Sequence, residues 1–178
     1  KGANYIPQDI FETDTFDHRS LLEDVYQCGF NMLRVWGGGR YESDAFYQEC
    51  DRLGIMVWQD FMFACGMVPG DQEFRENVRE EAEQQVFRLS QYACIALWCG
   101  NNEIDEAWHR WGWQTGLSAS TKERLWGDYQ AIFNNLLPLA VSKWSNYNSY
   151  WPSSPLWGRG DPRFQTEGDA HDWGIWHD

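Results

Sequence analysis

Several polar residues stand at the ends of short apolar segments, and their types and spacing could do chemistry. They form four sets: Asn4; Arg34 with Trp36; Gln59 with Asp60; and Asn102 with Glu103. In parallel α/β proteins the carboxyl ends of the strands open onto one site, so four sets in phase indicate one shared pocket. Carboxylates and amides bind sugar hydroxyls, and Trp rings offer a flat apolar face to a sugar ring. The combination therefore favours carbohydrate chemistry.

Glu103 has two interpretations. It follows the apolar segment Ile95–Cys99 and the residues Gly100, Asn101 and Asn102. In the first interpretation Glu103 is a general acid/base and Asn102 positions a substrate hydroxyl. In the second, Asn101 or Asn102 caps a helix whose dipole favours a carboxylate in its first turn. Spacing alone does not separate these interpretations, but the other three polar sets favour the first.

The elements that must position these residues alternate between strand and helix. Apolar segments predict strands at residues 3–6, 31–36, 55–58 and 95–99, with a fifth strand between 144 and 155. Helical periodicity predicts a helix that ends at Gly29, one from Ser43 to Gly54, one that begins at Asp71, and one over 121–142. This order is typical of βα units on a parallel sheet.

The fold class follows from the absence of nucleotide motifs and from the number of units. A doubly wound sheet is possible, but the sequence has no G-x-G-x-x-G and no P-loop, so a (β/α)8 TIM barrel is favoured. A closed barrel needs eight units and ~250 residues. The chain has 178 residues, so we expect one domain over 1–178, a partial barrel of about four to five βα units. Its open strand edges should pair with the remainder of the barrel or with another chain.

Composition excludes several classes of partner and cofactor. The formal net charge of −13 argues against nucleic acid as a partner. No apolar segment approaches the ~20 residues that a membrane span needs. The 5 cysteines form no C-x-x-C pair, so we expect neither a disulfide framework nor a zinc site, and no cofactor. Residues 1–7 lack an initiator Met and a signal peptide, which is typical of a piece of a longer protein and assigns no compartment.

Three segments carry a resemblance to a known family. Residues 31–39 read Asn-Met-Leu-Arg-Val-Trp-Gly-Gly-Gly, residues 57–65 contain Trp-Gln-Asp-Phe-Met-Phe-Ala-Cys, and residues 97–103 end in Gly-Asn-Asn-Glu. They resemble the β-mannosidases of glycoside hydrolase family 2. The resemblance extends from residues 1–7 to residues 168–173 and so covers nearly the whole chain. The sibling β-galactosidases and β-glucuronidases share the Asn-Glu pair, but they do not share Arg-Val-Trp-Gly-Gly-Gly.

The resemblance implies a retaining exo-β-mannosidase that removes terminal non-reducing β-D-mannose. Glu103 matches the acid/base of the family and Asn102 its partner for the sugar 2-hydroxyl. Arg34 and Trp36 match residues of the mannose subsite, and Trp111 matches an aromatic residue near the acid/base. An apolar pocket and a nearby negative charge would raise the pKa of such an acid.

Two further residues keep alternatives open. His171 and Asp169 match a Gly-Asp-x-His-x-Trp segment of the family, so His171 either reaches the pocket or stabilises its loop. Asp60 either binds sugar or pairs with Arg34, and the pairing is favoured. Three further aromatic residues could form a sugar platform, although helix packing is favoured for them: Trp108, Trp113 and Trp126.

The catalytic pair is expected to be incomplete. A retaining glycosidase needs a second carboxylate ~5–5.5 Å from the acid/base. In the family this nucleophile follows the seventh strand, and no residue of this chain matches it. Glu167 is a weak candidate. We therefore expect a fragment that hydrolyses nothing alone. The alternatives are a β-galactosidase-like sibling and a non-catalytic sugar-binding fragment.

Overall fold

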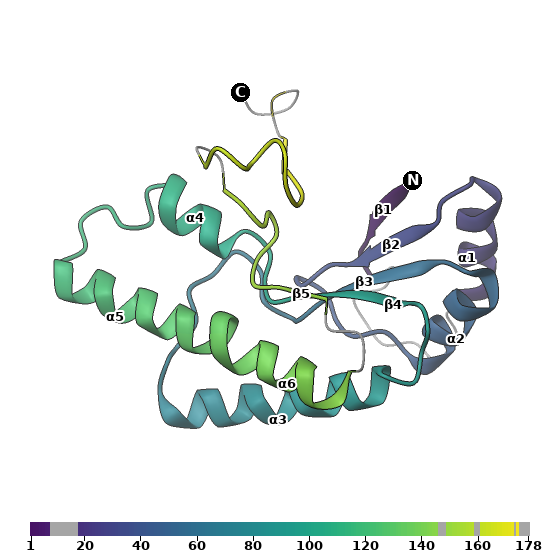
Figure 1. The fold of residues 1–178 in the computed structure, drawn as a ribbon, viewed down its shortest axis with the longest axis horizontal. Coiled ribbons are helices and arrows are strands. Elements are labelled where there is room, and N and C mark those ends of the chain that lie inside the picture. The colour runs from purple at the N-terminus through teal and green to yellow at the C-terminus, as the bar shows by residue number, and fades with distance from the viewer. Residues whose placement is uncertain (8–17, 146–148, 159–160, 173, 175–178) are drawn as a thin grey trace.

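The structure is a computed structural model that describes residues 1–7, 18–145, 149–158, 161–172 and 174. Strands and helices alternate as the sequence predicts, up to β4 (Figure 1). The elements are β1 (Gly2–Tyr5), α1 (His18–Gln27), β2 (Met32–Val35), α2 (Asp44–Leu53), β3 (Met56–Asp60), α3 (Gln72–Leu89), β4 (Ile95–Cys99), α4 (Ile104–Arg110), α5 (Ala119–Tyr129), the π-helix η1 (Gln130–Leu136), α6 (Leu137–Trp144) and β5 (Tyr150–Trp151).

The strands form one parallel sheet in the order β1-β2-β3-β4-β5, which is also their order in the chain. A doubly wound sheet reverses its strand order at a switch point, and the described strands show no reversal. The expectation of a mixed α/β fold with a parallel sheet is therefore confirmed. Because all five strands run the same way, their carboxyl ends meet at one edge of the sheet.

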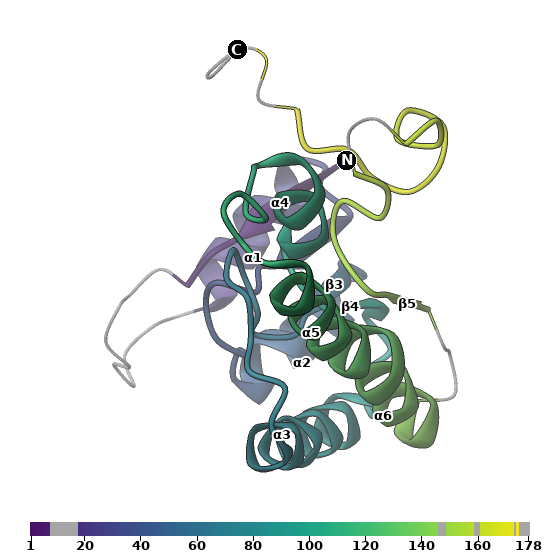
Figure 2. The same ribbon diagram turned by 90° about the vertical axis from the view of Figure 1, so that its left-hand side faces the viewer.

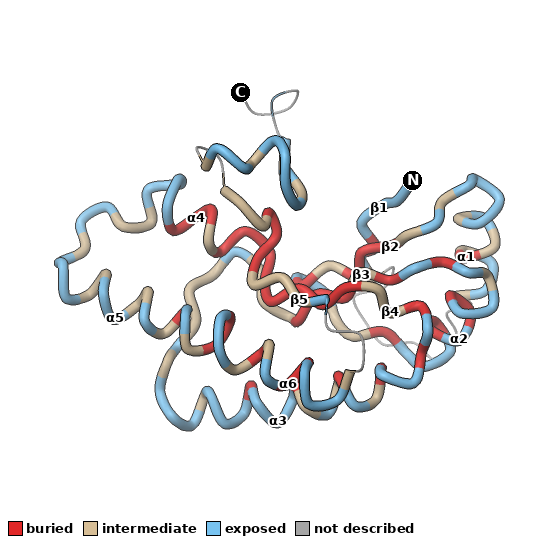
Figure 3. Tube along the Cα trace, in the orientation of Figure 1, coloured by how far each residue is buried: buried red, intermediate tan, exposed pale blue. Residues whose placement is uncertain are grey.

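The core lies between one face of the sheet and the helices. Side chains alternate between the two faces of a strand, and Leu33, Val35 and Val57 point into the core, where they are buried. The apolar stripe of α3 adds Val78, Ala82, Val86 and Leu89. Helices α3 and α6 pack side by side (Figure 2). Burial is concentrated in β2–β4 and in the connection from β4 to α4, where three of the four polar sets lie (Figure 3).

Local signals in the sequence set most helix ends. Asp71 caps α3 by accepting a hydrogen bond from Phe74 N at 2.9 Å. Gly54 ends α2 with φ 69°, a conformation that favours glycine. Ser43 stands at the N-cap of α2, but its side chain accepts no capping hydrogen bond. The Phe46 N–H instead donates to the Ser43 carbonyl.

The prediction of one long helix over 121–142 is wrong in one respect. The structure divides this segment into α5, η1 and α6. Pro138 lies in the first turn of α6 and has no N–H to donate to the preceding turn. The π-helical turns directly before it therefore coincide with a break in the regular hydrogen-bond ladder. No helix in the described part of the chain is long and apolar enough to cross a membrane.

Candidate active site

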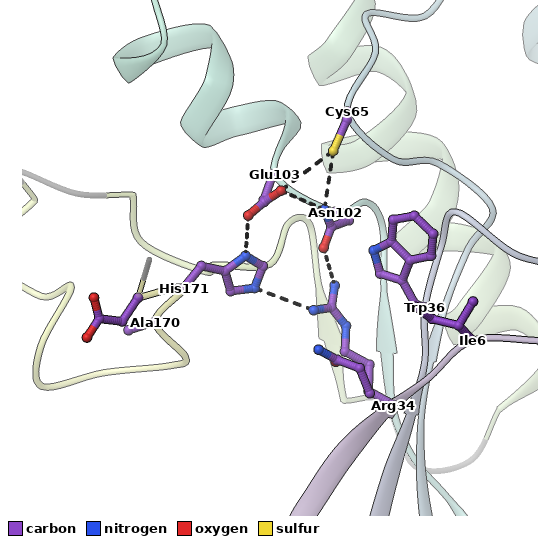
Figure 4. A pocket seen from close by; sticks show the side chains of 10 residues that line it. Ile6, Arg34, Trp36, Cys65, Asn102, Glu103, Ala170 and His171 are labelled. Atoms are coloured by element: carbon purple, nitrogen blue, oxygen red, sulfur yellow. Dashed lines mark hydrogen bonds and ion pairs between the residues drawn. The ribbon is translucent and has the colours of Figure 1, made fainter. Parts of the chain in front are cut away.

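A pocket of about 480 Å³ opens at the carboxyl ends of the strands (Figure 4). Its wall comes from the ends of β1, β2 and β4, from the loop after β3, and from the C-terminal segment. The lining residues are Asn4, Ile6, Arg34, Trp36, Cys65, Asn102, Glu103, Ala170, His171 and Asp172. The structure thus brings together three of the four polar sets that the sequence singles out.

The fourth set lies beneath this wall. Asp60 ends β3 and is fully buried. Its carboxylate accepts hydrogen bonds from Arg34 Nε at 3.2 Å and Nη2 at 2.8 Å, from Gly37 N at 3.0 Å and from Trp58 Nε1 at 2.9 Å. The structure therefore places Asp60 in the ion pair with Arg34, away from the pocket surface, so a direct contact with sugar does not fit its burial.

Arg34 connects this buried pair to the pocket. Its side chain is only 9 % exposed, and burial opposes the charge of its guanidinium, but Asp60 outweighs burial and raises the pKa of Arg34. Arg34 Nη2 also donates to Asn102 Oδ1 at 3.0 Å. This contact fixes the Asn102 amide with its nitrogen on the other side, where Nδ2 donates to Glu103 Oε2 at 3.0 Å. A chain of hydrogen bonds therefore orients the Glu103 carboxylate from β3 outward.

The segment from Asn101 to Glu103 divides between helix capping and the pocket wall. Asn101 Oδ1 accepts from Ile104 N at 3.0 Å, so the Asn101 side chain caps α4, a short helix that the sequence offered as one of two interpretations, while Glu103 stands at the N-cap position itself. Asn101 is fully buried, and its Nδ2 donates to Pro152 O at 2.7 Å. Asn102 and Glu103 turn the other way and line the pocket.

Backbone strain gathers at the same place. Among the described residues, the only non-glycine residues with positive φ are Cys65, at 51°, and Glu103, at 63°. The Cys65 thiol donates to Glu103 Oε2 at 3.6 Å and accepts from Asn102 Nδ2 at 3.5 Å. Burial raises the pKa of Cys65, as does the Glu103 carboxylate, so the thiol keeps its proton. Such strained conformations cluster at functional sites.

His171 reaches the pocket from the C-terminal segment. Its Nδ1 lies 2.7 Å from Glu103 Oε1, and its Nε2 lies 2.9 Å from Ser154 Oγ and 3.5 Å from Asp169 Oδ2. Burial lowers the pKa of His171, but hydrogen bonds to Asp169 and Glu103 outweigh burial and raise this pKa to about 9. Both alternatives for His171 therefore hold, because it contacts the pocket and anchors its own loop.

Some expected residues lie elsewhere. Trp111 follows α4, is 45 % exposed, and contacts Trp113 edge-on with ring centroids 6.3 Å apart, away from the described pocket wall. Trp111 is eight residues beyond Glu103, so a helical rise of ~1.5 Å per residue places it roughly 12 Å further along the helix axis. Glu167 is exposed and does not line the pocket. Trp126 stacks on Tyr129 at 4.4 Å and on Trp108 at 6.1 Å, which fits helix packing.

Sequence reasoning missed Cys65, Ser154 and Asp172 as parts of this site. Ser154 and Asp172 carry no motif signal, and Cys65 stands out only as the last residue of a family-like segment. Within the described ranges, no group of three or more His, Cys, Asp and Glu side chains could hold a metal ion. The site instead surrounds the Glu103 carboxylate with N–H and S–H donors, next to a guanidinium and an indole ring, so it suits proton transfer beside a hydroxylated ligand.

Comparison with known proteins shows which proteins share this sequence and fold. A solved β-D-mannosidase from Dictyoglomus thermophilum superimposes with a TM-score of 0.83 at 46 % identity, over 99 % of this chain and 21 % of that one. The β-mannosidase B of Emericella nidulans is 41 % identical over 185 residues, 99 % of this chain and 22 % of the relative. The chain is β-mannosidase-like. The resemblance that the sequence motifs indicate is thereby confirmed.

Other comparisons show how much of each relative the chain covers and where only the fold is shared. The β-mannosidase of Capra hircus is 51 % identical over 115 residues, 64 % of the β-mannosidase-like chain and 13 % of the relative. A β-glucuronidase of Bacteroides uniformis superimposes with a TM-score of 0.62 at 19 % identity, which shows the fold alone. No protein-family model matches the chain. The chain spans about a fifth of the length of the relatives that it matches from end to end.

Proposed function

We propose that the chain is the N-terminal part of the (β/α)8 barrel of a retaining exo-β-mannosidase, with Glu103 as its general acid/base. One observation carries the proposal: the Glu103 carboxylate lines the pocket at the strand ends and is held there by Asn102 and His171. The sequential order of the parallel strands supports a barrel, and the names of the relatives support the substrate class.

The proposed chemistry gives one role to each of four wall residues. Glu103 protonates the oxygen that leaves the anomeric carbon, and as carboxylate it later takes a proton from the attacking water. Asn102 binds the sugar 2-hydroxyl, since its amide is already oriented by Arg34 and Glu103. Arg34 donates to a further hydroxyl, and Trp36 offers its ring face to the terminal β-D-mannose.

The nucleophile has no counterpart on the described wall. The other carboxylate that lines the pocket is Asp172, which is exposed and whose Oδ1 accepts from Gly174 N at 2.9 Å. This contact makes Asp172 a loop-stabilising residue. We therefore assign the nucleophile to a part of the enzyme outside residues 1–178, and the chain alone does not turn over substrate.

The described sheet also leaves room for the rest of a barrel. Strand β1 pairs only with β2, and β5 pairs only with β4, among the described strands. An exposed parallel edge is a template for further pairing. The remainder of the barrel, or another chain, is therefore assigned to these two edges.

A graft tests the proposal. Residues 1–178 replace the matching segment of the Dictyoglomus thermophilum enzyme, and hydrolysis of an aryl β-mannoside is measured. We expect turnover by the graft and none by the isolated chain. The Glu103→Ala variant of the graft should lose turnover, and azide should restore it, because azide attacks the glycosyl-enzyme without help from a general base. Glu167→Gln is the matched control and should remain active.

Three outcomes would contradict the proposal. Faster hydrolysis of an aryl β-galactoside by the graft would assign a sibling activity. Turnover by the isolated chain would show that it carries its own nucleophile, and Asp172→Asn would then identify or exclude Asp172. Saturable mannose binding by the isolated chain, combined with a graft that is folded but inactive, would assign a sugar-binding fragment.

A further inference from the structure

The hydrogen bonds around His171 fix where its protons lie. The Ser154 hydroxyl donates its one proton to Asp169 Oδ2 at 2.6 Å. Burial opposes the charge of Asp169, but hydrogen bonds from His171 and Ser154 outweigh burial and lower its pKa, so Asp169 accepts as a carboxylate. The Ser154 oxygen is then an acceptor for His171 Nε2 at 2.9 Å. The Nε2 atom therefore carries a proton.

The other ring nitrogen then shares a proton with Glu103. His171 Nδ1 and Glu103 Oε1 lie 2.7 Å apart. Two acceptors cannot approach so closely without a proton between them, and two donors would clash. The contact therefore holds one proton, as an imidazolium beside a carboxylate or as an imidazole beside a carboxylic acid.

The surrounding charges balance this pair. Arg34 Nη1 lies 3.4 Å from His171 Nε2, and a guanidinium nitrogen can only donate. Since Nε2 gives its proton to Ser154 at the shorter distance of 2.9 Å, the Arg34 contact sets donor against donor and opposes a positive ring, while Asp60 neutralises Arg34 from below. Asp169 faces the same ring nitrogen at 3.5 Å and favours its charge. On the Glu103 side, Asn102 and the Cys65 thiol both donate to Oε2. Asp172 is the remaining carboxylate on the wall.

We propose that His171 is a positioning residue whose ring shares with Glu103 the proton that the leaving oxygen receives, and that Ser154 and Asp169 hold the ring for this purpose. The inference rests on the proposed function and deepens it. When the glycosidic oxygen takes the proton from Glu103, the pair is left as a carboxylate and a neutral imidazole with its proton on Nε2. The water that releases the sugar returns one proton to the pair.

The same distances resemble a Ser-His-Glu triad, which would imply a different reaction. In such a triad the serine hydroxyl donates to the histidine and attacks the substrate. Here Ser154 is fully buried and its proton goes to Asp169. Ser154 can neither meet a substrate nor give its proton to His171, so the geometry favours the anchoring role.

Nitrogen-15 NMR of the histidine rings of the 178-residue chain tests proton sharing without any need for activity. We expect protonated Nδ1 and Nε2 on His171 at pH 8, and a fall in its pKa of about 1 unit or more in Glu103→Gln and in Asp169→Asn. The ring-nitrogen signals of His109, which lies 3.1 Å from Asp105, serve as the internal reference for all variants. A neutral His171 ring beside an ionised Glu103 carboxylate at pH 7, the carboxylate being read from its carbon-13 shift, would overturn the proposal, as would a titration that Glu103→Gln leaves unchanged.

The pH profile of the grafted enzyme separates proton sharing from other roles. His171→Asn keeps an N–H donor near the position of Nδ1 but cannot titrate. If the pair shares its proton, the basic limb of kcat/KM moves to lower pH in His171→Asn. A simple neighbouring cation predicts the opposite shift, because its removal would raise the pKa of Glu103, and a purely structural role predicts none. Either of these results overturns the proposal, whereas a graft inactive with every residue intact refutes the proposed function and leaves the NMR test standing.

Discussion

Removal of the Asp60 carboxylate should destabilise the chain strongly. Asp60 accepts four N–H groups, two of them from Arg34. In Asp60→Ala, the guanidinium of Arg34 stays in a site where it is 9 % exposed and loses its counter-charge. The loss of one partner of a buried ion pair costs about 3–5 kcal/mol, because the other charge remains buried and uncompensated.

Urea unfolding followed by tryptophan fluorescence measures this cost. The double variant Arg34→Met/Asp60→Leu removes both charges and should regain most of the lost stability, since apolar pairs often replace buried ion pairs at little cost. Glu76→Ala is the control, because Glu76 pairs with Arg79 at 2.8 Å on the surface of α3. That variant should unfold at the same urea concentration as the parent chain.

The reasoning fails if Asp60→Ala unfolds like Glu76→Ala. It also fails in part if the double variant is as unstable as Asp60→Ala. In that case the hydrogen bonds to Gly37 and Trp58, and not the uncompensated charge, would account for the loss.

Three further predictions concern the frame of the pocket. Asn101→Ala should lower the free energy of unfolding by about 2–4 kcal/mol, because it removes the α4 cap and leaves buried groups without partners; an unchanged urea midpoint would contradict this. Gly100→Ala should cost about 1–3 kcal/mol, since its Cβ would lie 2.4 Å from Pro152 O, whereas Gly66→Ala, with no atom nearer than 3.8 Å, should have little effect. The pKa of His171 rises from 6.5 to about 9 on folding, so the protonated ring stabilises the folded state. This stabilisation is complete below pH 6.5 and is lost as pH rises through 9. At ~1.4 kcal/mol per pH unit this is about 3 kcal/mol, and urea unfolding of His171→Asn at both pH values should lack this difference.

Local sequence signals predicted most of the fold. Apolar segments of four to five residues with polar ends predicted β1–β4, and Asp71 and Gly54 marked helix ends that depend on neighbouring residues alone. The division of 119–144 into three helical pieces was missed, because helical periodicity does not distinguish an α-turn from a π-turn. The seven residues of α4 were too few for a clear pattern.

The sequence predicted those residues of the site that lie at the ends of strands. Arg34, Asn102 and Glu103 meet because parallel strands bring their ends together. Cys65 was missed, because its place on the wall depends on a positive φ that no neighbouring residue signals. Asp60 was singled out by position, but only the structure shows that the Arg34 side chain lies between it and the pocket. Trp111 was carried over from the family, and its placement depends on the course of the chain after α4.

The strand order also has a consequence for how the chain reaches its native state. Each strand pairs with the one that precedes it, so the sheet can grow outward from β1 while later residues are still emerging from the ribosome. The pocket cannot form in this gradual way, because it joins Arg34 to His171, 137 residues apart. A nascent chain would therefore acquire its sheet early and its ionisable cluster last. Until the C-terminal segment arrives, the Glu103 carboxylate would face water without its imidazole partner.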